Sequence, residues 1–221
     1  MKKVLIIEDE AEINQLLQAI LRKKNCESIA AYSGTEGLLH LQKQSFDLVL
    51  LDLMLPGMNG QEVLQNIRTT STVPVIVLSA KKAMEDKVEL LKNGADDYIT
   101  KPFSEDEVAV RIEVQLRRIA QRGDQGRSWR EIQVDAVKHT AMICGEKLQL
   151  TNAEFDILCL FLNYPERALS KREIYEKIWR GTYVGDDNTI SVHVSNLRKK
   201  IAKETTDEYI KTIWGIGFML V

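Results

Sequence analysis

The sequence has few cysteines and histidines, and they form no pattern typical of a disulfide framework or a metal site. Among 221 residues there are three cysteines and three histidines. The cysteines are odd in number and have no CxxC spacing, which argues against both disulfides and zinc. They are Cys26, Cys144 and Cys159, and the widely separated histidines are His40, His139 and His193. We therefore expect no transition metal.

Long apolar runs are also missing. The chain begins MKKVLIIEDE, where charged residues follow the apolar run Val4–Ile7 too soon for a secretory signal. No other segment approaches the roughly 20 consecutive apolar residues that span a bilayer. These absences predict a soluble, cytoplasmic protein with no membrane insertion.

An excess of positive charge is the third missing feature, since the formal net charge is −2 at pH 7. Residues 1–119 contain 15 Lys and Arg against 18 Asp and Glu, and residues 129–221 contain 13 of each kind. A nucleic-acid partner would have to bind a local basic patch, because neither half of the chain is basic overall.

The first half of the chain alternates short apolar runs with amphipathic segments. The runs Leu48–Leu51 and Val75–Leu78 are apolar throughout, as strands buried on both faces of a parallel sheet must be. Five strands alternating with helices predict a doubly wound α/β domain over residues 1–119, with its sites at the carboxyl ends of the strands. The expected strands are Val4–Ile7, Ser28–Ala31, Leu48–Leu51, Val75–Leu78 and Tyr98–Thr100.

The second half of the chain has a different pattern of apolar and polar residues. Residues 120–128 include QRGDQGRS, which has two glycines and no apolar residue and is typical of an exposed linker. After it, short alternating stretches over Trp129–Leu150 predict small antiparallel strands. Helical spacing then predicts three helices, around Phe155–Leu162, after Ser170, and over Thr189–Lys203. Two short strands around Gly215 and Gly217 complete a predicted winged helix-turn-helix over residues 129–221.

Carboxylates follow two of the expected strands. Glu8 and Asp9 come after the first strand and Asp52 after the third, so the three side chains are expected at one edge of the sheet. Oxygen ligands of this kind suit Mg²⁺. Lys101 and Ser79 add a cation and a hydroxyl to the same edge, and the set fits phosphoryl transfer to Asp52. Taken singly, each residue is equally consistent with an ordinary solvent-exposed strand end.

Four stretches of the first half resemble the receiver domain of bacterial response regulators, over residues 1 to about 119. These are IIEDE, LVLLDLMLPGMNG, VIVLSA and GADDYITKPF. The resemblance implies the strand order 2-1-3-4-5 and phosphorylation of Asp52. It implies Mg²⁺ ligation by Asp9, Asp52 and the Met54 carbonyl, with Glu8 acting through water. It also implies that Ser79 and Lys101 hold the phosphoryl group, and that Tyr98 is an aromatic switch residue.

The last predicted helix separates an apolar face from a polar one. Ile190, Val194, Leu197 and Ile201 share a narrow face, and the opposite face carries Val192, Ser195, Asn196, Lys199 and Lys203. A helix of this kind fits the major groove of DNA. Asn196 suits a pair with adenine and Val192 a thymine methyl, while the lysines suit phosphate. The same pattern also occurs on helices that merely face solvent.

Four stretches of the second half resemble the DNA-binding domain of the OmpR/PhoB family of winged-helix response regulators. These are LQLTNAEFDILCLFL, ALSKREIYEKIW, DNTISVHVSNLRKKI and IKTIWGIGFML. Trp214 stands where relatives carry a minor-groove arginine, so stacking on a sugar and simple packing are both open. The DNA-facing positions carried over are Asn188, Ser191, Val192, His193, Ser195, Asn196, Thr212 and Trp214.

The same resemblance implies a homodimer through the face formed by the receiver's fourth and fifth helices and fifth strand. The expected crossed ion pairs are Lys87 with Glu107, Asp97 with Arg111, and Asp96 with Arg118. Each exposed pair contributes at most about 1 kcal/mol, but a two-fold dimer makes every pair twice.

Together these features predict a transcription regulator whose Asp52 is phosphorylated by a sensor histidine kinase and which binds promoter DNA and RNA polymerase. Beyond chemistry at its own Asp52, we expect no enzymatic activity. Two alternatives stay open. One is a phosphatase that uses the carboxylate pocket on a small substrate, and the other is a phosphorylation-independent DNA-binding regulator whose receiver is only a dimerisation module.

Overall fold

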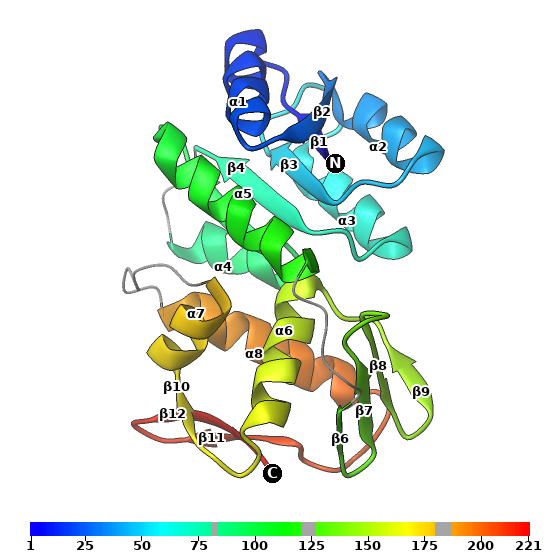
Figure 1. Ribbon diagram of the computed structural model, residues 1–221, viewed down its shortest axis with the longest axis vertical. Helices are drawn as coiled ribbons and strands as arrows, with labels where there is room; N and C mark the ends of the chain where they lie inside the picture. The colour runs from blue at the N-terminus through cyan, green and yellow to red at the C-terminus, as the bar shows by residue number, and fades with distance from the viewer. Residues whose placement is uncertain (81–83, 121–126, 180–186) are drawn as a thin grey trace. The chain divides into compact units, whose positions relative to one another are not determined.

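The computed structural model describes residues 1–80, 84–120, 127–179 and 187–221, which belong to two compact units, Met1–Ile119 and Ala120–Val221 (Figure 1). In the first unit, five parallel strands form one sheet in the order β2-β1-β3-β4-β5, which confirms the predicted doubly wound fold. Its elements are β1 (Lys2–Ile7), α1 (Ala11–Lys23), β2 (Cys26–Ala31), α2 (Gly34–Lys43), β3 (Leu48–Asp52), α3 (Gly60–Thr70), β4 (Val75–Ser79), α4 (Met84–Lys92), β5 (Asp97–Thr100) and α5 (Glu105–Ala120).

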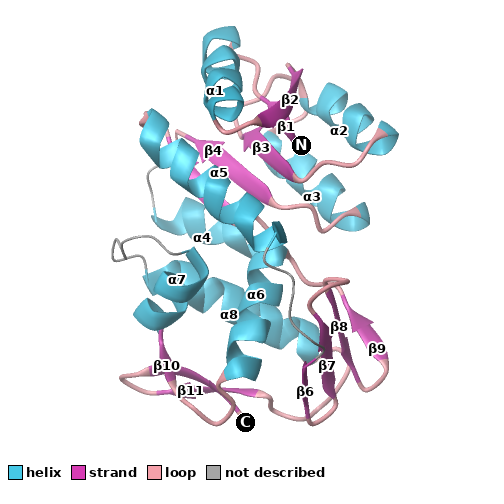
Figure 2. Ribbon diagram, in the orientation of Figure 1, coloured by secondary structure: helices cyan, strands magenta, loops and turns pink. Residues whose placement is uncertain are grey.

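Helices cover both faces of this sheet (Figure 2). On one face, α1 and α5 pack on alternate strand residues such as Val4, Ile6 and Leu50. On the other face, α2 approaches β1 so closely that a Cβ on Gly37 would lie 2.3 Å from the Ile7 side chain. Every residue of β3 and β4 is buried, because these central strands have helices above and below.

Polar caps fix where helices of the first unit begin. At the start of α2, the Glu36 amide donates to Ser33 Oγ at 3.3 Å. The Glu36 carboxylate, however, accepts from the Tyr32 amide rather than from Ser33. A complete capping box opens α3, where Asn59 Oδ1 accepts from the Glu62 amide and Glu62 accepts from the Asn59 amide. This cap ends the loop that follows Asp52.

Over residues 127–179 and 187–221, the second unit contains a four-stranded antiparallel sheet, three helices and a three-stranded sheet of order β10-β12-β11. The helices α6 and α7 both pack against α8, as a winged helix-turn-helix requires. Its elements are β6 (Arg127–Trp129), β7 (Ile132–Asp135), β8 (Thr140–Ile143), β9 (Glu146–Leu148), α6 (Asn152–Asn163), β10 (Leu169–Ser170), α7 (Lys171–Trp179), α8 (Asp187–Ile201), β11 (Ile210–Ile213) and β12 (Gly217–Leu220).

The first strand of this unit begins inside the segment expected to be a linker. Arg127 pairs with Val134 in the β6–β7 ladder, two residues before the expected domain start at Trp129. Arg127 and Ser128 are polar, so the start of this edge strand cannot be recognised from apolar spacing in the sequence. Residues 121–126 lie outside the described part of the chain.

A close backbone approach shapes the three-stranded sheet. A Cβ on Gly217 would lie 2.1 Å from the Leu169 carbonyl oxygen, so only glycine lets β12 pair with β10 at this point. The hairpin formed by β11 and β12 is the expected wing. Among the helices that the structure describes, none combines the length and the apolarity needed to cross a bilayer.

Candidate functional site

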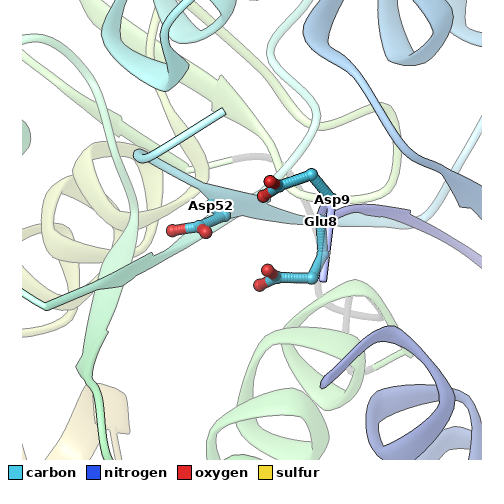
Figure 3. A group of neighbouring side chains, drawn as sticks. All are labelled: Glu8, Asp9 and Asp52. Atoms are coloured by element: carbon cyan, nitrogen blue, oxygen red, sulfur yellow. The ribbon is translucent and has the colours of Figure 1, made fainter. Parts of the chain in front are cut away.

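Three carboxylates meet where the central strands of the first unit end. Ile7 pairs with Leu51 in the parallel ladder, so Glu8 and Asp52, which each follow one of these residues, come side by side. Glu8, Asp9 and Asp52 each offer a carboxylate oxygen, and these oxygens lie within 4.8 Å of one another. Figure 3 shows the three carboxylates on the same side of the strand ends. The site therefore concentrates negative charge in a small volume.

A half-buried lysine partly offsets this charge. Lys101 Nζ lies 2.8 Å from Glu8 Oε2 and 2.9 Å from Asp52 Oδ2. The relative exposures of Glu8 and Asp52 are 0% and 2%. The Lys101 amide donates to the Ser79 carbonyl at 2.8 Å, which ties the residue after β5 to the end of β4. The Lys101–Pro102 peptide bond is cis.

Burial and mutual charge shift the protonation equilibria of the pocket. Burial raises the pKa of Glu8 to about 7, and the Asp52 carboxylate acts in the same direction, against the hydrogen bond from Lys101. Burial alone would lower the pKa of Lys101, but its hydrogen bonds to Glu8 and Asp52 outweigh burial and raise it. Glu8 thus exchanges a proton near neutral pH, while Lys101 stays charged.

The remaining residues expected in the pocket surround Asp52. The Met54 amide donates to Asp52 Oδ1 at 3.3 Å, and the Met54 side chain is 66% exposed. Ser79 is buried at the end of β4, directly after Leu78, whose partner across the ladder is Asp52. Tyr98 is half-buried on β5, with Lys87 Nζ 4.8 Å from its ring centroid. In this arrangement Asp52 Oδ1 accepts from the Met54 amide, and Asp52 Oδ2 accepts from the Lys101 ammonium.

The donor set suits a hard divalent cation. Glu8, Asp9 and Asp52 present only oxygen, and the Lys101 ammonium that is bonded to two of them cannot ligate a metal while it is protonated. Mg²⁺ prefers such oxygens and binds through a few carboxylates and water. The residues present therefore fit the magnesium ion that the sequence predicts.

In the second unit, the apolar face of α8 is as expected, but its polar face is only partly exposed. Ile190, Val194, Leu197 and Ile201 are all buried. Asn188, Ser195 and Lys199 are exposed and Ser191 is half-buried.

Three of the residues expected to face DNA are instead buried, with relative exposures of 6% for Val192, 1% for His193 and 9% for Asn196. The expectation that they lie on an exposed face is therefore wrong for this structure. The Trp179 ring, 5.7 Å from the His193 ring, accounts for part of this burial. Hydrophobic spacing cannot reveal it, because His193 and Asn196 are polar.

The Arg198 side chain of α8 is bonded to the wing. Arg198 donates from Nε to the Ile210 carbonyl at 2.8 Å and from Nη2 to Thr212 Oγ1 at 3.0 Å. At the hairpin tip, Trp214 is 91% exposed, and Gly215 supplies the positive φ of 74° that the turn needs. Trp214 therefore does not pack against the protein, which removes one of the two interpretations of this residue.

Comparisons with known proteins cover both units. The family described as "Response regulator receiver domain" matches residues 4–113, and the one described as "Transcriptional regulatory protein, C terminal" matches residues 145–220. The chain is 38% identical to the uncharacterized transcriptional regulatory protein YcbL of Bacillus subtilis, over 98% of this chain and 99% of YcbL. It is 37% identical to the sensory transduction protein RegX3 of Mycolicibacterium smegmatis, over 100% of this chain and 99% of RegX3. The chain belongs to the OmpR/PhoB family of response regulators.

Solved structures agree with this assignment. DrrB of Thermotoga maritima, described as an OmpR/PhoB homolog, is 25% identical, with a TM-score of 0.53 over 100% of this chain and 99% of DrrB. A RitR mutant has a TM-score of 0.82 at 23% identity, over 100% of this chain and 99% of that one, and so supports the fold. This response regulator is thus a two-component DNA-binding transcription regulator, of a class whose receivers bind Mg²⁺ in an acidic pocket.

Two residues that shape the pocket of the response regulator were not found from the sequence. Asn14 is fully buried and donates from Nδ2 to the Glu8 carbonyl at 3.0 Å, which fixes the turn after β1. A Cβ on Gly60 would lie 2.2 Å from the Asp52 carbonyl oxygen, so the loop after Asp52 closes only on glycine. The sequence feature that could have identified Asn14 is its position as a polar residue next to the apolar face of α1.

The acidic residues expected at the dimer face already have partners within the chain. Asp97 Oδ1 accepts from Arg111 at 2.8 Å, and Arg111 also lies 3.3 Å from Glu107. The fully buried Asp96 pairs with Arg68 at 2.8 Å and accepts from the Val75 amide. The Arg118 side chain lies outside the described residues. A dimer of this response regulator would have to exchange some of these contacts.

Proposed function

We propose that this response regulator binds promoter DNA in a phosphorylation-dependent manner, after a sensor histidine kinase transfers a phosphoryl group to Asp52. The observation that carries the proposal is the arrangement around Asp52. One of its oxygens accepts from Lys101 at 2.9 Å, and two further carboxylates lie within 4.8 Å. A carboxylate with a cation and a metal-ligand set beside it can act as a phosphoryl acceptor.

A bound Mg²⁺ would supply positive charge that offsets repulsion between the carboxylate and the phosphoryl oxygens. Asp9, Asp52 and the Met54 carbonyl would ligate it, with Glu8 acting through water. Its binding is expected to compete with protons at Glu8, whose pKa is raised to about 7 by burial and by Asp52. The pocket residues are therefore matched to a divalent ion near neutral pH.

The transfer forms one bond and breaks one. An Asp52 carboxylate oxygen bonds to phosphorus, the phosphorus–nitrogen bond of the phosphohistidine breaks, and the imidazole nitrogen keeps the electron pair and takes a proton. Lys101 then pairs with a phosphoryl oxygen instead of Asp52 Oδ2, and the Ser79 hydroxyl donates to another. Tyr98 turns inward when Ser79 moves, which carries the change to the α4-β5-α5 face.

At that face, phosphorylation shifts a monomer–dimer equilibrium. The dimer makes crossed pairs of Lys87 with Glu107, Asp97 with Arg111, and Asp96 with Arg118. Sedimentation of wild type and Glu107→Ala, with and without phosphate, tests this step. We expect wild type to sediment faster when phosphorylated and Glu107→Ala to respond less. Unchanged sedimentation of the wild type would remove dimerisation from the mechanism.

Two winged helices in such a dimer bind repeated half-sites in double-stranded promoter DNA and recruit RNA polymerase in the cytoplasm. Asn188, Ser191, Ser195 and Lys199 on α8 and Thr212 and Trp214 on the wing make the first contacts. Val192, His193 and Asn196 contribute only once they are uncovered, because they are buried in this structure. The receiver's only chemistry is phosphorylation and dephosphorylation of Asp52.

Intact mass after incubation with acetyl phosphate and Mg²⁺ tests the central claim. A single phosphoryl group adds about 80 Da to the wild type. Asp52→Ala should gain nothing. Asp47→Asn is the matched control and should still gain the group, because Asp47 pairs with Lys2 outside the pocket.

If neither the wild type nor the control gains mass, the second candidate takes over, a phosphorylation-independent regulator whose receiver only dimerises. The rival reading as a phosphatase makes a different prediction. It requires continuing release of phosphate from small phosphoesters, beyond what Asp52 itself turns over.

A further inference from the structure

The side chain of Arg198 lies between α8 and the wing. Two of its nitrogens are bonded to β11, with Nε donating to the Ile210 carbonyl at 2.8 Å and Nη2 donating to Thr212 Oγ1 at 3.0 Å. Its guanidinium carbon lies 5.5 Å from the Phe218 ring centroid, and Phe218 is the ladder partner of Thr212. One arginine thus spans both strands of the wing from the helix.

Its neighbour Lys199 is placed differently. Lys199 is exposed, whereas Arg198 is half-buried. Burial lowers the pKa of the Arg198 guanidinium, and only the Glu208 carboxylate acts in the opposite direction. Two adjacent cations on one helix therefore have separate surroundings: Lys199 is accessible to a phosphate, and Arg198 is directed into the protein.

The bonded strand leads directly to the tip of the wing. Thr212 is two residues from Trp214, which is 91% exposed, and the turn continues through Ile216, which is 54% exposed. In the three-stranded sheet β12 is held by β10, but β11 is an edge strand that pairs with β12 on one side, so side-chain bonds to β11 add to what fixes the direction of the tip. The bonds from Arg198 therefore set the position of the tip relative to α8.

We infer that Arg198 is a positioning residue for DNA recognition, which holds the wing at the spacing from α8 that lets both elements reach the same duplex. The inference rests on the proposed DNA-binding roles of α8 and the wing. It assigns Arg198 no phosphate of its own. Preorganised contacts gain affinity because the wing does not lose freedom on binding.

The salt dependence of binding separates positioning from phosphate contact. Each phosphate contact contributes about 0.9 to the slope of log K against log salt. Arg198→Gln removes the bonds to β11 and should weaken binding on the order of tenfold, with the slope of the wild type retained. Lys199→Gln is the matched control and should reduce the slope by about 0.9. The probe is a duplex that the wild type selects from a random-sequence library.

A second variant keeps the test independent of how well Arg198→Gln folds. Thr212→Val keeps the shape and every charge but removes the Oγ1 acceptor for Arg198. Because Thr212 is also proposed to contact DNA, the deciding result is its coupling to Arg198→Gln and not its own loss of affinity. Thr212→Val should weaken binding in the same direction, and the double variant should lose less than the sum of the two losses, because both remove one interaction. Amide exchange over residues 210–213 should be faster than in the wild type in both variants.

A slope that falls equally in Arg198→Gln and Lys199→Gln would overturn the inference in favour of phosphate contact. Unchanged affinity in both Arg198→Gln and Thr212→Val would also overturn it. If the wild type selects no duplex at all, the proposed DNA-binding function fails together with the inference. The first two outcomes leave that function intact.

Discussion

Lys101 Nζ lies 2.9 Å from Asp52 Oδ2, although the two residues are 49 positions apart in the sequence. The same ammonium lies 2.8 Å from Glu8 Oε2, so one cation is shared by two buried carboxylates. Lys101 thus supplies positive charge that partly balances these carboxylates. Binding of a metal ion, or addition of a phosphoryl group to Asp52, would change that charge balance. We therefore expect the hydrogen-bond partners of Asp52 to change when a metal ion or a phosphoryl group is present.

Replacing Lys101 should separate metal binding from phosphoryl transfer. In Lys101→Met, the carboxylates lose a competing cation, so we expect Mg²⁺ to bind more tightly, on the order of tenfold. Phosphorylation by acetyl phosphate should slow at least as much, because no ammonium offsets the phosphoryl oxygens. Calorimetric titration with Mg²⁺ and the rate of mass gain measure the two effects. Lys2→Met, which loses a pair with Asp47 outside the pocket, should change neither. Weaker Mg²⁺ binding in Lys101→Met would contradict this account.

Stability without metal should fall as pH rises toward neutrality. The pKa of Glu8 is raised from 4.5 to about 7 in the folded chain, chiefly by burial. Between these values the folded state binds more protons than the unfolded state, so its free energy of unfolding decreases with rising pH, on the order of 1–3 kcal/mol. The effect is complete above the folded pKa. Thermal unfolding in a chelator from pH 5 to pH 8 measures it.

Glu8→Gln should be less sensitive to pH over that window, because it has no proton to lose. The exposed Glu12→Gln on α1 should behave like the wild type. Addition of Mg²⁺ at pH 8 should stabilise the wild type more than Glu8→Gln. A pH profile that is the same in wild type and Glu8→Gln would show that Glu8 does not titrate there.

Gly60→Ala should distort the acidic pocket, although Gly60 itself is not one of the residues expected to bind the metal or the phosphoryl group. Its Cβ would lie 2.2 Å from the Asp52 carbonyl oxygen and 2.6 Å from Leu53 Cα, and backbone atoms cannot move away as a flexible side chain can. We expect a loss of about 2 kcal/mol or more in the free energy of unfolding, together with weaker Mg²⁺ binding.

Gly57→Ala is the comparison, because Gly57 has a φ of +76° but nothing within 4 Å of its Cβ position. It should cost only about 1 kcal/mol of backbone strain and spare the metal site. Denaturant unfolding and Mg²⁺ titration distinguish the two variants. Equal Mg²⁺ affinity in both would mean that the loop closure does not hold the site.

Trp214→Ala should weaken DNA binding without altering stability. The side chain is 91% exposed, so its removal should change the free energy of unfolding by no more than about 0.5 kcal/mol. Loss of an aromatic contact with the duplex should cost about 1–3 kcal/mol of affinity, by analogy with base stacking. Val137→Ala, 67% exposed in the second unit, is the control and should affect neither property. Wild-type affinity in Trp214→Ala would exclude the wing tip from the interface.

The parallel sheet was predicted well from the sequence because short apolar runs mark its strands. The all-apolar runs at β3 and β4 had to be central, since only strands covered on both faces tolerate such runs. The carboxylates at the ends of β1 and β3 were predictable for the same reason, because parallel strands end at one edge. The helix α8 was placed to within two residues at each end by its apolar spacing.

The sequence by itself thus determined the order of the elements, the two units and the identity of the acidic residues around Asp52. The tertiary structure decided which oxygens Lys101 bonds, that Gly60 and Asn14 shape the pocket, and that Arg198 is bonded to the wing. It also decided that Val192, His193 and Asn196 are buried. The physical reason is range: hydrophobic periodicity reports local burial along one element, whereas these contacts join polar groups distant in sequence, whose partners exist only once the chain has folded.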